Sequence, residues 1–214
     1  MATICVLLET TPKKTFASAL DWPGLARSGR DEISALEALA AALPRYAPVA
    51  ALAGEPFDAA ATLEVVERRP GDATTAYGAP SIVADADRLP TDAAAGQRIA
   101  ALVDAAWRTL DDVAAVAPEE LRKGPRGGGR DRTKVVGHVR QSEGAYAQVM
   151  GRKHRPVDTD AVAAMHADLL AVLREPSDGS PLAGKRWPVR YAARRIAWHA
   201  LDHAWEIEDR SEVG

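Results

Sequence analysis

The chain has 214 residues, of which 44 are alanine, 27 are basic, 30 are acidic and one, Cys5, is a cysteine. This length suffices to bury a hydrophobic core, and an alanine-rich composition favours helices. The formal net charge of −3 offers no global attraction to nucleic acid, and one cysteine excludes a disulfide framework or a CxxC metal or redox motif. Without a signal peptide or an apolar run of the ~18 residues that a membrane helix needs, a cytoplasmic protein with no membrane partner is expected.

Residues 1–80 are expected to form a small α/β module with the order β-β-α-β. An apolar run at residues 4–8 and a less cleanly alternating segment at residues 15–20 are separated by a short turn, as in a strand hairpin. Polar and apolar residues alternate over residues 62–68, which predicts a half-buried third strand.

The helix of this module is expected between the second and third strands. Asp31 is a suitable N-cap for a helical body over residues 33–39. Pro44 and Pro48 are expected to end or kink the helix, because proline lacks the amide donor that the helical ladder needs.

After a connector at residues 81–91, residues 92–214 are expected to be helical. Four segments carry apolar residues at alternating spacings of three and four, which predicts amphipathic helices. They cover about residues 92–117, 134–150, 158–174 and 189–209. Four such helices in sequence favour an antiparallel four-helix bundle, so the expected class is α+β.

The last of these helices carries two histidines, His199 and His203, spaced four residues apart. This spacing places both imidazoles on one helical face, where they can reach a single transition-metal ion. Trp198, Leu201 and Trp205 lie on the opposite side. This second apolar face has to be covered, either by the N-terminal module or by a second subunit in a homodimer.

His138 lies on the apolar stripe of the second predicted helix, and a catalytic metal site needs about three protein ligands and one open position. The sequence therefore nominates three histidines as metal ligands, although the alternative of hydrogen-bonded core histidines stays open. Polar groups nearby would fix the orientation of these ligands by a hydrogen bond to the ring nitrogen that does not bind the metal. The ligand candidates are His138, His199 and His203, and the supporting candidates are Glu206, Asp202 and Ser142.

Two segments resemble the DinB-like metalloprotein superfamily: residues 133–143, TKVVGHVRQSE, and residues 194–203, RRIAWHALDH. The likeness extends over about residues 92–210 and is one of pattern. It implies a four-helix bundle that holds a divalent metal ion. The ligand positions that the resemblance assigns are His138, His199 and His203.

Members of that superfamily with known activity include thiol-dependent transferases and the mycothiol-dependent maleylpyruvate isomerase. The resemblance therefore implies a metal-dependent enzyme that acts on a small molecule with a low-molecular-weight thiol as cosubstrate, as an S-transferase or isomerase. Zinc is the first choice of metal, and imidazole ligands also suit nickel or iron. No catalytic residue is assigned. A non-catalytic metal- or ligand-binding stress-response protein is the alternative.

A basic, glycine-rich loop at residues 122–132 precedes the second predicted helix. It has neither the preceding strand nor the GK[ST] ending of a phosphate-binding loop. It is interpreted as a solvated linker, with an anion-binding lid as the alternative. The residues that such a lid would use are Arg126, Arg130 and Arg132.

The N-terminal half resembles the HicB-like antitoxin fold through residues 16–25, FASALDWPGL, and residues 35–39, ALEAL. The likeness covers about residues 3–70. It implies a strand hairpin, a turn, a helix and a further strand. The DNA-binding domain that follows in that family is missing, so neither operator binding nor antitoxin activity is expected. A protein partner of the toxin–antitoxin type is the third functional alternative.

Overall fold

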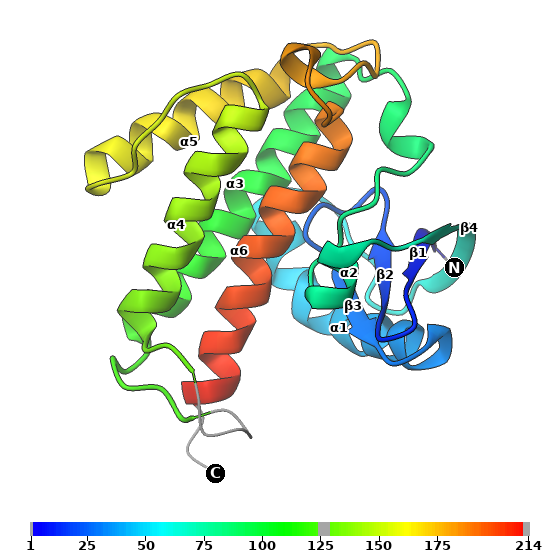
Figure 1. Cartoon of the computed structure of the whole chain (residues 1–214), viewed down its shortest axis with the longest axis horizontal. Helices are drawn as coiled ribbons and strands as arrows, with labels where there is room; N and C mark the ends of the chain where they lie inside the picture. The colour runs from blue at the N-terminus through cyan, green and yellow to red at the C-terminus, as the bar shows by residue number, and fades with distance from the viewer. Residues whose placement is uncertain (1, 124–128, 212–214) are drawn as a thin grey trace.

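The computed structural model describes residues 2–123 and 129–211 and contains a four-stranded mixed sheet with the order β3-β2-β1-β4 (Figure 1). β1 pairs antiparallel with β2 and parallel with β4, and β2 pairs antiparallel with β3. The strands are β1 (Thr3–Thr10), β2 (Thr15–Ala19), β3 (Ala26–Gly29) and β4 (Thr62–Pro70).

The parallel strands β1 and β4 are connected through α1 (Glu32–Leu52). Asp31 caps this helix as predicted, because its carboxylate accepts a hydrogen bond from the Ser34 amide at 2.8 Å. Of the two outcomes expected for Pro44 and Pro48, an end or a kink of the helix, the end was wrong, since α1 continues through both. Both prolines are exposed. Water can therefore bond the carbonyl groups that lose their helical partner.

The remaining helices follow β4 in the chain, and the four longer ones occupy the ranges expected from their apolar spacing. In the described ranges, none of the helices has both the length and the apolar content needed to cross a membrane. Besides the 3-10 turns Ala86–Arg88 and Leu182–Gly184, these helices are α2 (Ala73–Tyr77), α3 (Ala93–Val116), α4 (Arg132–Val149), α5 (Thr159–Arg174) and α6 (Val189–Ser211).

The predicted arrangement, a β-β-α-β module followed by an antiparallel four-helix bundle, was wrong. The sheet has a further strand, β3, whose four residues are too few to show an alternating pattern. The helices of the two parts also interleave, because α1 packs against α3 as well as the sheet, and α5 packs mainly on α3. Figure 1 shows α5 running across the other helices instead of along them. Over residues 2–123 and 129–211 the molecule is an α+β fold with a four-stranded mixed sheet and six α-helices.

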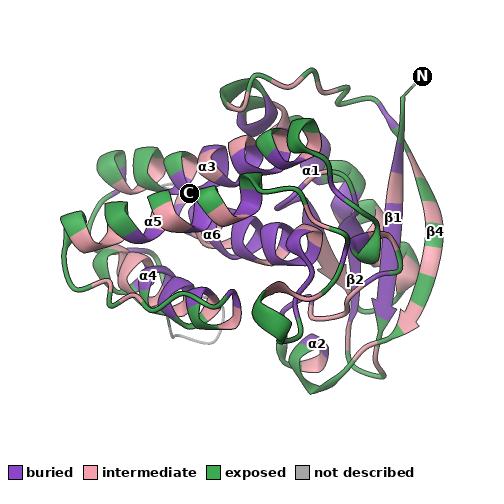
Figure 2. Cartoon of the chain, turned by 90° about the horizontal axis from the view of Figure 1, so that it is seen from above, coloured by how far each residue is buried: buried purple, intermediate pink, exposed green. Residues whose placement is uncertain are grey.

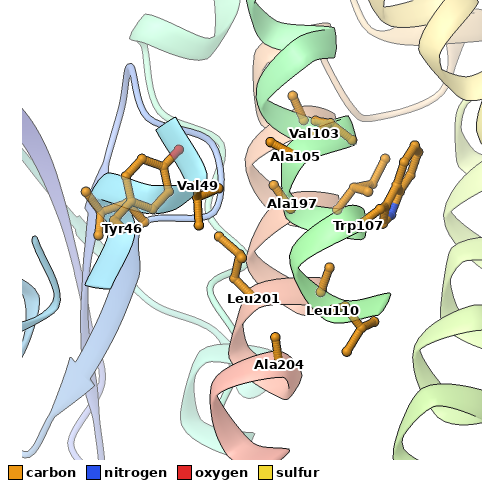
Figure 3. Close-up of a cluster of buried hydrophobic side chains, with 14 of the residues drawn as sticks. Tyr46, Val49, Val103, Ala105, Trp107, Leu110, Ala197, Leu201 and Ala204 are labelled. Atoms are coloured by element: carbon orange, nitrogen blue, oxygen red, sulfur yellow. The ribbon is translucent and has the colours of Figure 1, made fainter. Parts of the chain in front are cut away.

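Helix α6 lies at the centre of the structure and is buried on two sides (Figure 2). One side packs against α3 and α4. On the other side, Trp198 packs edge-on against Phe16 with ring centroids 5.9 Å apart, and Leu201 contacts the turn at Gly24. Figure 3 shows Tyr46 and Val49 of α1 on this same side of Leu201. The N-terminal part of the chain therefore covers the second apolar face.

A buried ion pair also joins α6 to the segment between β4 and α3. The Arg194 guanidinium donates to Asp87 through Nη2 at 2.6 Å and through Nε at 3.0 Å. The Asp87 carboxylate also accepts a hydrogen bond from the Ala84 amide at 2.7 Å. Both side chains are almost fully buried, at 6% and 1% exposure. The pair fixes α6 against a segment that has little regular structure of its own.

Candidate metal centre

Three histidines from two helices meet at one point between α4 and α6. Their potential ligand nitrogens all lie within 4.8 Å of one another. The ring centroid of His138 is 5.1 Å from that of His199 and 5.2 Å from that of His203, and the latter two are 4.8 Å apart. These are the three histidines that the sequence nominates. Of the five histidines in the chain, these three form the described cluster.

The helices explain why these rings meet. His199 and His203 are one turn apart on α6 and so project from the same side. That side faces α4, which packs against α6 and contributes His138. His199 is buried at 6% exposure, whereas the side chain of His203 is 15% exposed. The cluster therefore lies at the edge of the helical packing, with one part buried and another reachable from solvent.

Burial determines the protonation state of the deepest histidine. Loss of hydration is the largest cause that lowers the pKa of His199 to about 2, followed by the neighbouring His203, Arg195 and His138. The pKa of His138 is also lowered, chiefly by burial and then by Arg130. A neutral imidazole carries a lone pair, so both rings have the form that binds a metal ion.

The Nδ1 atom of His199 is buried and has no hydrogen-bond partner in the described structure. Buried polar atoms normally have a hydrogen-bond partner, so this nitrogen is available to bond a group that is absent from the chain. Three imidazoles form a donor set that suits zinc, nickel or iron. The residues present therefore fit a divalent transition metal.

Glu206 forms a hydrogen bond with the ring of His203. Its Oε2 lies 2.7 Å from His203 Nδ1, and its Oε1 accepts a hydrogen bond from Arg210 Nη1 at 2.9 Å. The hydrogen bond with His203 is the main cause of the lowered pKa of Glu206, so the carboxyl group is ionised. A carboxylate on Nδ1 fixes the ring so that Nε2 is the free ligand atom, which is the common arrangement behind a metal-binding histidine.

Replacing Glu206 by glutamine is therefore expected to weaken metal binding by about 10- to 100-fold, because the ring of His203 loses its charged partner. Competition against a chromophoric chelator measures this change. Glu208→Gln is the matched control, since Glu208 lies on the same helix and pairs with Arg45 at 2.5 Å. Equal metal affinity in the two variants would contradict the role of Glu206.

The two other supporting candidates have different positions. Asp202 forms an ion pair with Arg27 of β3 at 3.1 Å, so its carboxylate is turned to the sheet. Ser142 lies one turn after His138 on α4 and is half-buried. Only Glu206 among the three supporting candidates has a hydrogen bond to a clustered histidine in the described structure.

The structure describes two of the three arginines proposed for an anion-binding loop, Arg130 and Arg132. Arg126 lies outside the described residues. Arg132 donates hydrogen bonds to the Ala117 carbonyl at 2.8 Å and to Glu119 at 3.0 Å, which joins the start of α4 to the end of α3. The backbone carbonyl of Arg130 accepts a hydrogen bond from Arg210 at 2.8 Å, and the side chain is exposed. Of the two arginines that the structure describes, Arg130 is the one whose charge lowers the pKa of His138 and His199.

The other two histidines lie outside the cluster. His154 contacts Asp168, with Nε2 2.8 Å from the carboxylate. His166 stacks on Trp107 and has its Nε2 2.9 Å from Glu143, which is buried beside Arg140. Glu143 is five residues beyond His138 and so leaves α4 on a different face. The amphipathic pattern did not predict that Glu143 is buried, because such a pattern assigns buried positions to apolar residues.

Two residues near the cluster have no role in the sequence interpretation. Tyr146 of α4 has its ring centroid 5.8 Å from that of His199. Arg195 precedes His199 by one turn of α6 and stacks on Tyr146. The spacing of four residues between Arg195 and His199 could have predicted that Arg195 lies near the cluster, since it places both side chains on one helical face.

Comparison of the chain with protein-family models gives no match, and comparisons with curated proteins and with solved structures give none. The DinB-like and HicB-like resemblances therefore stay predictions.

Proposed function

We propose that the protein is a divalent-metal-dependent enzyme that acts on a small molecule, with a low-molecular-weight thiol as cosubstrate, in an S-transfer or isomerisation reaction. The observation that carries this proposal is the cluster of His138, His199 and His203, whose ligand nitrogens lie within 4.8 Å of one another. The choice of thiol chemistry rests on the DinB-like pattern around these histidines.

The residues of the chain supply the binding and orientation. The three imidazoles would supply three protein ligands to a metal ion, the number that a catalytic site with one exchangeable position uses. Glu206 fixes the ring of His203, and the surrounding helices exclude water from His199. When bound, a divalent metal ion supplies Lewis acidity, which lowers the pKa of a thiol and so favours the nucleophilic thiolate.

Metal analysis of protein purified without a histidine tag tests the first part of the proposal. We expect about one zinc, nickel or iron ion per chain after reconstitution and removal of free metal. Zn–N bonds of about 2.0–2.1 Å place two ligand nitrogens at most about 4 Å apart, so metal binding should draw the three rings together. A protein that retains no ion under these conditions would contradict the proposal.

A thiol-consumption assay tests the second part. Metal-loaded protein is mixed with an aryl halide electrophile and, in turn, with cysteine, glutathione and mycothiol. We expect turnover that requires both the thiol and the metal and that stops when a chelator removes the ion. Stoichiometric metal without turnover of any thiol would support the non-catalytic metal-binding alternative instead.

A further inference from the structure

A surface cavity of about 720 Å³ lies where the turn after α4 meets the segment before α6. The C-terminal end of α4 and the N-terminal end of α6 lie at the same end of the molecule in Figure 1. The volume falls within the roughly 300–1,000 Å³ of small-molecule sites. We call this space the basic cavity, because four of its seven lining residues are cationic: Arg152, Lys153, Arg155 and Lys185.

Two contacts hold the walls of the basic cavity together. Gly151 has a φ of +81°, and a Cβ at this position would lie 2.5 Å from the Cβ of Ala183. The turn after α4 therefore touches the 3-10 turn Leu182–Gly184. Lys185 Nζ also donates a hydrogen bond to the Gln148 carbonyl at 2.6 Å. The cations are consequently carried by two segments that pack directly against each other.

The cations of the basic cavity outnumber the carboxylates that contact them. Arg152 Nε lies 3.1 Å from Asp168 of α5, which is the described carboxylate that pairs with this set. Four cations against one carboxylate leave an excess of three positive charges, in a chain whose net charge is −3. Within the described ranges, the lining cations that form no ion pair are Lys153, Arg155 and Lys185.

Arg152 is oriented by its ion pair. Asp168 contacts the Nε atom, so the two Nη nitrogens have no partner of their own among the described residues. A guanidinium binds two oxygens of a phosphate group through paired N–H donors, and lysine ammonium groups bind phosphate as point charges. The basic cavity therefore combines both kinds of phosphate-binding side chain.

The excess of three charges selects the class of anion. A carboxylate carries one negative charge and would leave two cations unbalanced. Each phosphate group carries about 1.5–2 negative charges at pH 7, so a molecule with two phosphate groups balances the excess. None of the seven lining residues is Phe, Tyr or Trp. A nucleobase therefore finds no ring in the basic cavity on which to stack.

We propose that the basic cavity binds a compact small molecule that carries two or more phosphate groups and no aromatic base. This site is separate from the histidine cluster. Gln148, which lines the basic cavity, is ten residues beyond His138 on α4, which corresponds to a rise of about 15 Å. The inference therefore does not rest on the metal-dependent function.

Isothermal titration calorimetry with pyrophosphate tests the proposal, and inorganic phosphate is the comparison. Pyrophosphate also chelates divalent ions, so metal is first removed with a chelator, and gel filtration then removes the chelator. We expect one pyrophosphate per chain, bound about 10-fold or more tightly than phosphate because its charge is higher. The double variant Lys153→Gln/Arg155→Gln should weaken this binding by about 10- to 100-fold, since charge-assisted bonds are lost.

Lys13→Gln/Arg108→Gln is the matched control. Both residues are exposed and lie outside the basic cavity, and their replacement changes the net charge by the same amount. This variant should bind pyrophosphate as the wild type does. The proposal would be overturned by no binding in the wild type, by an equal loss in the two double variants, or by phosphate bound as tightly as pyrophosphate. A DNA duplex that binds more tightly than pyrophosphate through Lys153 and Arg155 would overturn it too.

His199→Ala separates this site from the metal centre. We expect this variant to bind pyrophosphate with the affinity of the wild type, which would support the basic cavity even if the protein holds no metal ion. Loss of pyrophosphate binding in His199→Ala would instead place the anion at the histidine cluster and contradict the proposal.

Discussion

Metal content should fall from about one ion per chain to background when His199 or His203 is replaced by alanine. Each variant keeps two of the three imidazoles, fewer than the three protein ligands that a catalytic metal site uses. In the wild type, an ion at 100 times its dissociation constant should add about 2.7 kcal/mol to the free energy of unfolding, and this increment should vanish in both variants. Metal analysis and thermal unfolding with and without metal measure the two effects.

His154→Ala is the control for this experiment. His154 pairs with Asp168 outside the cluster, so its loss should leave both the metal content and the metal-dependent increment unchanged. His203→Ala is the more informative of the two variants, because His203 is less buried and its removal disturbs the packing less. If either variant keeps its full metal content, the ion binds at a site other than the histidine cluster.

Replacing Asp87 by alanine should lower the free energy of unfolding by about 3–5 kcal/mol, because the Arg194 guanidinium then stays buried without its partner. The Ala84 amide, which donates to Asp87 at 2.7 Å, also loses its acceptor. Urea denaturation followed by far-UV circular dichroism measures the change.

Two further variants show whether burial causes this effect. Asp85→Ala removes an ion pair with Arg69, but the side chain of Asp85 is 78% exposed, so a change of no more than about 1 kcal/mol is expected. The double variant Asp87→Ala/Arg194→Met removes both buried charges and should be more stable than Asp87→Ala alone. A loss below about 1 kcal/mol in Asp87→Ala would contradict the assigned role of the pair.

The sequence predicted the long helices well because their signals are local. The capping carboxylate of Asp31 and that of Asp158 act over three residues, and both accept hydrogen bonds from the N-terminal amides of their helices. The two faces of α6 were likewise visible, since apolar residues on opposite sides of one helix require two partners. The pairing of His199 and His203 follows from the same helical geometry.

The arrangement of the helices could not be predicted in this way. An amphipathic stripe shows that a helix packs but does not name its partner, so the packing of α1 and α5 on α3 was missed. The strand β3 has four residues and was too short to identify. At the site, Glu206 could be named from helical spacing, whereas the contact of Arg195 with Tyr146 depends on how α4 approaches α6.

Because helix α6 packs against both the sheet and the other helices, we expect the molecule to unfold as a single cooperative unit. The same helix carries His199 and His203 on one side and packs against the sheet through Trp198 and Leu201 on the other. Its central amides can then exchange with solvent only when the sheet and the helices separate together. Occupation of the histidine cluster would consequently slow hydrogen exchange in the distant strands as well, although no strand contributes a ligand.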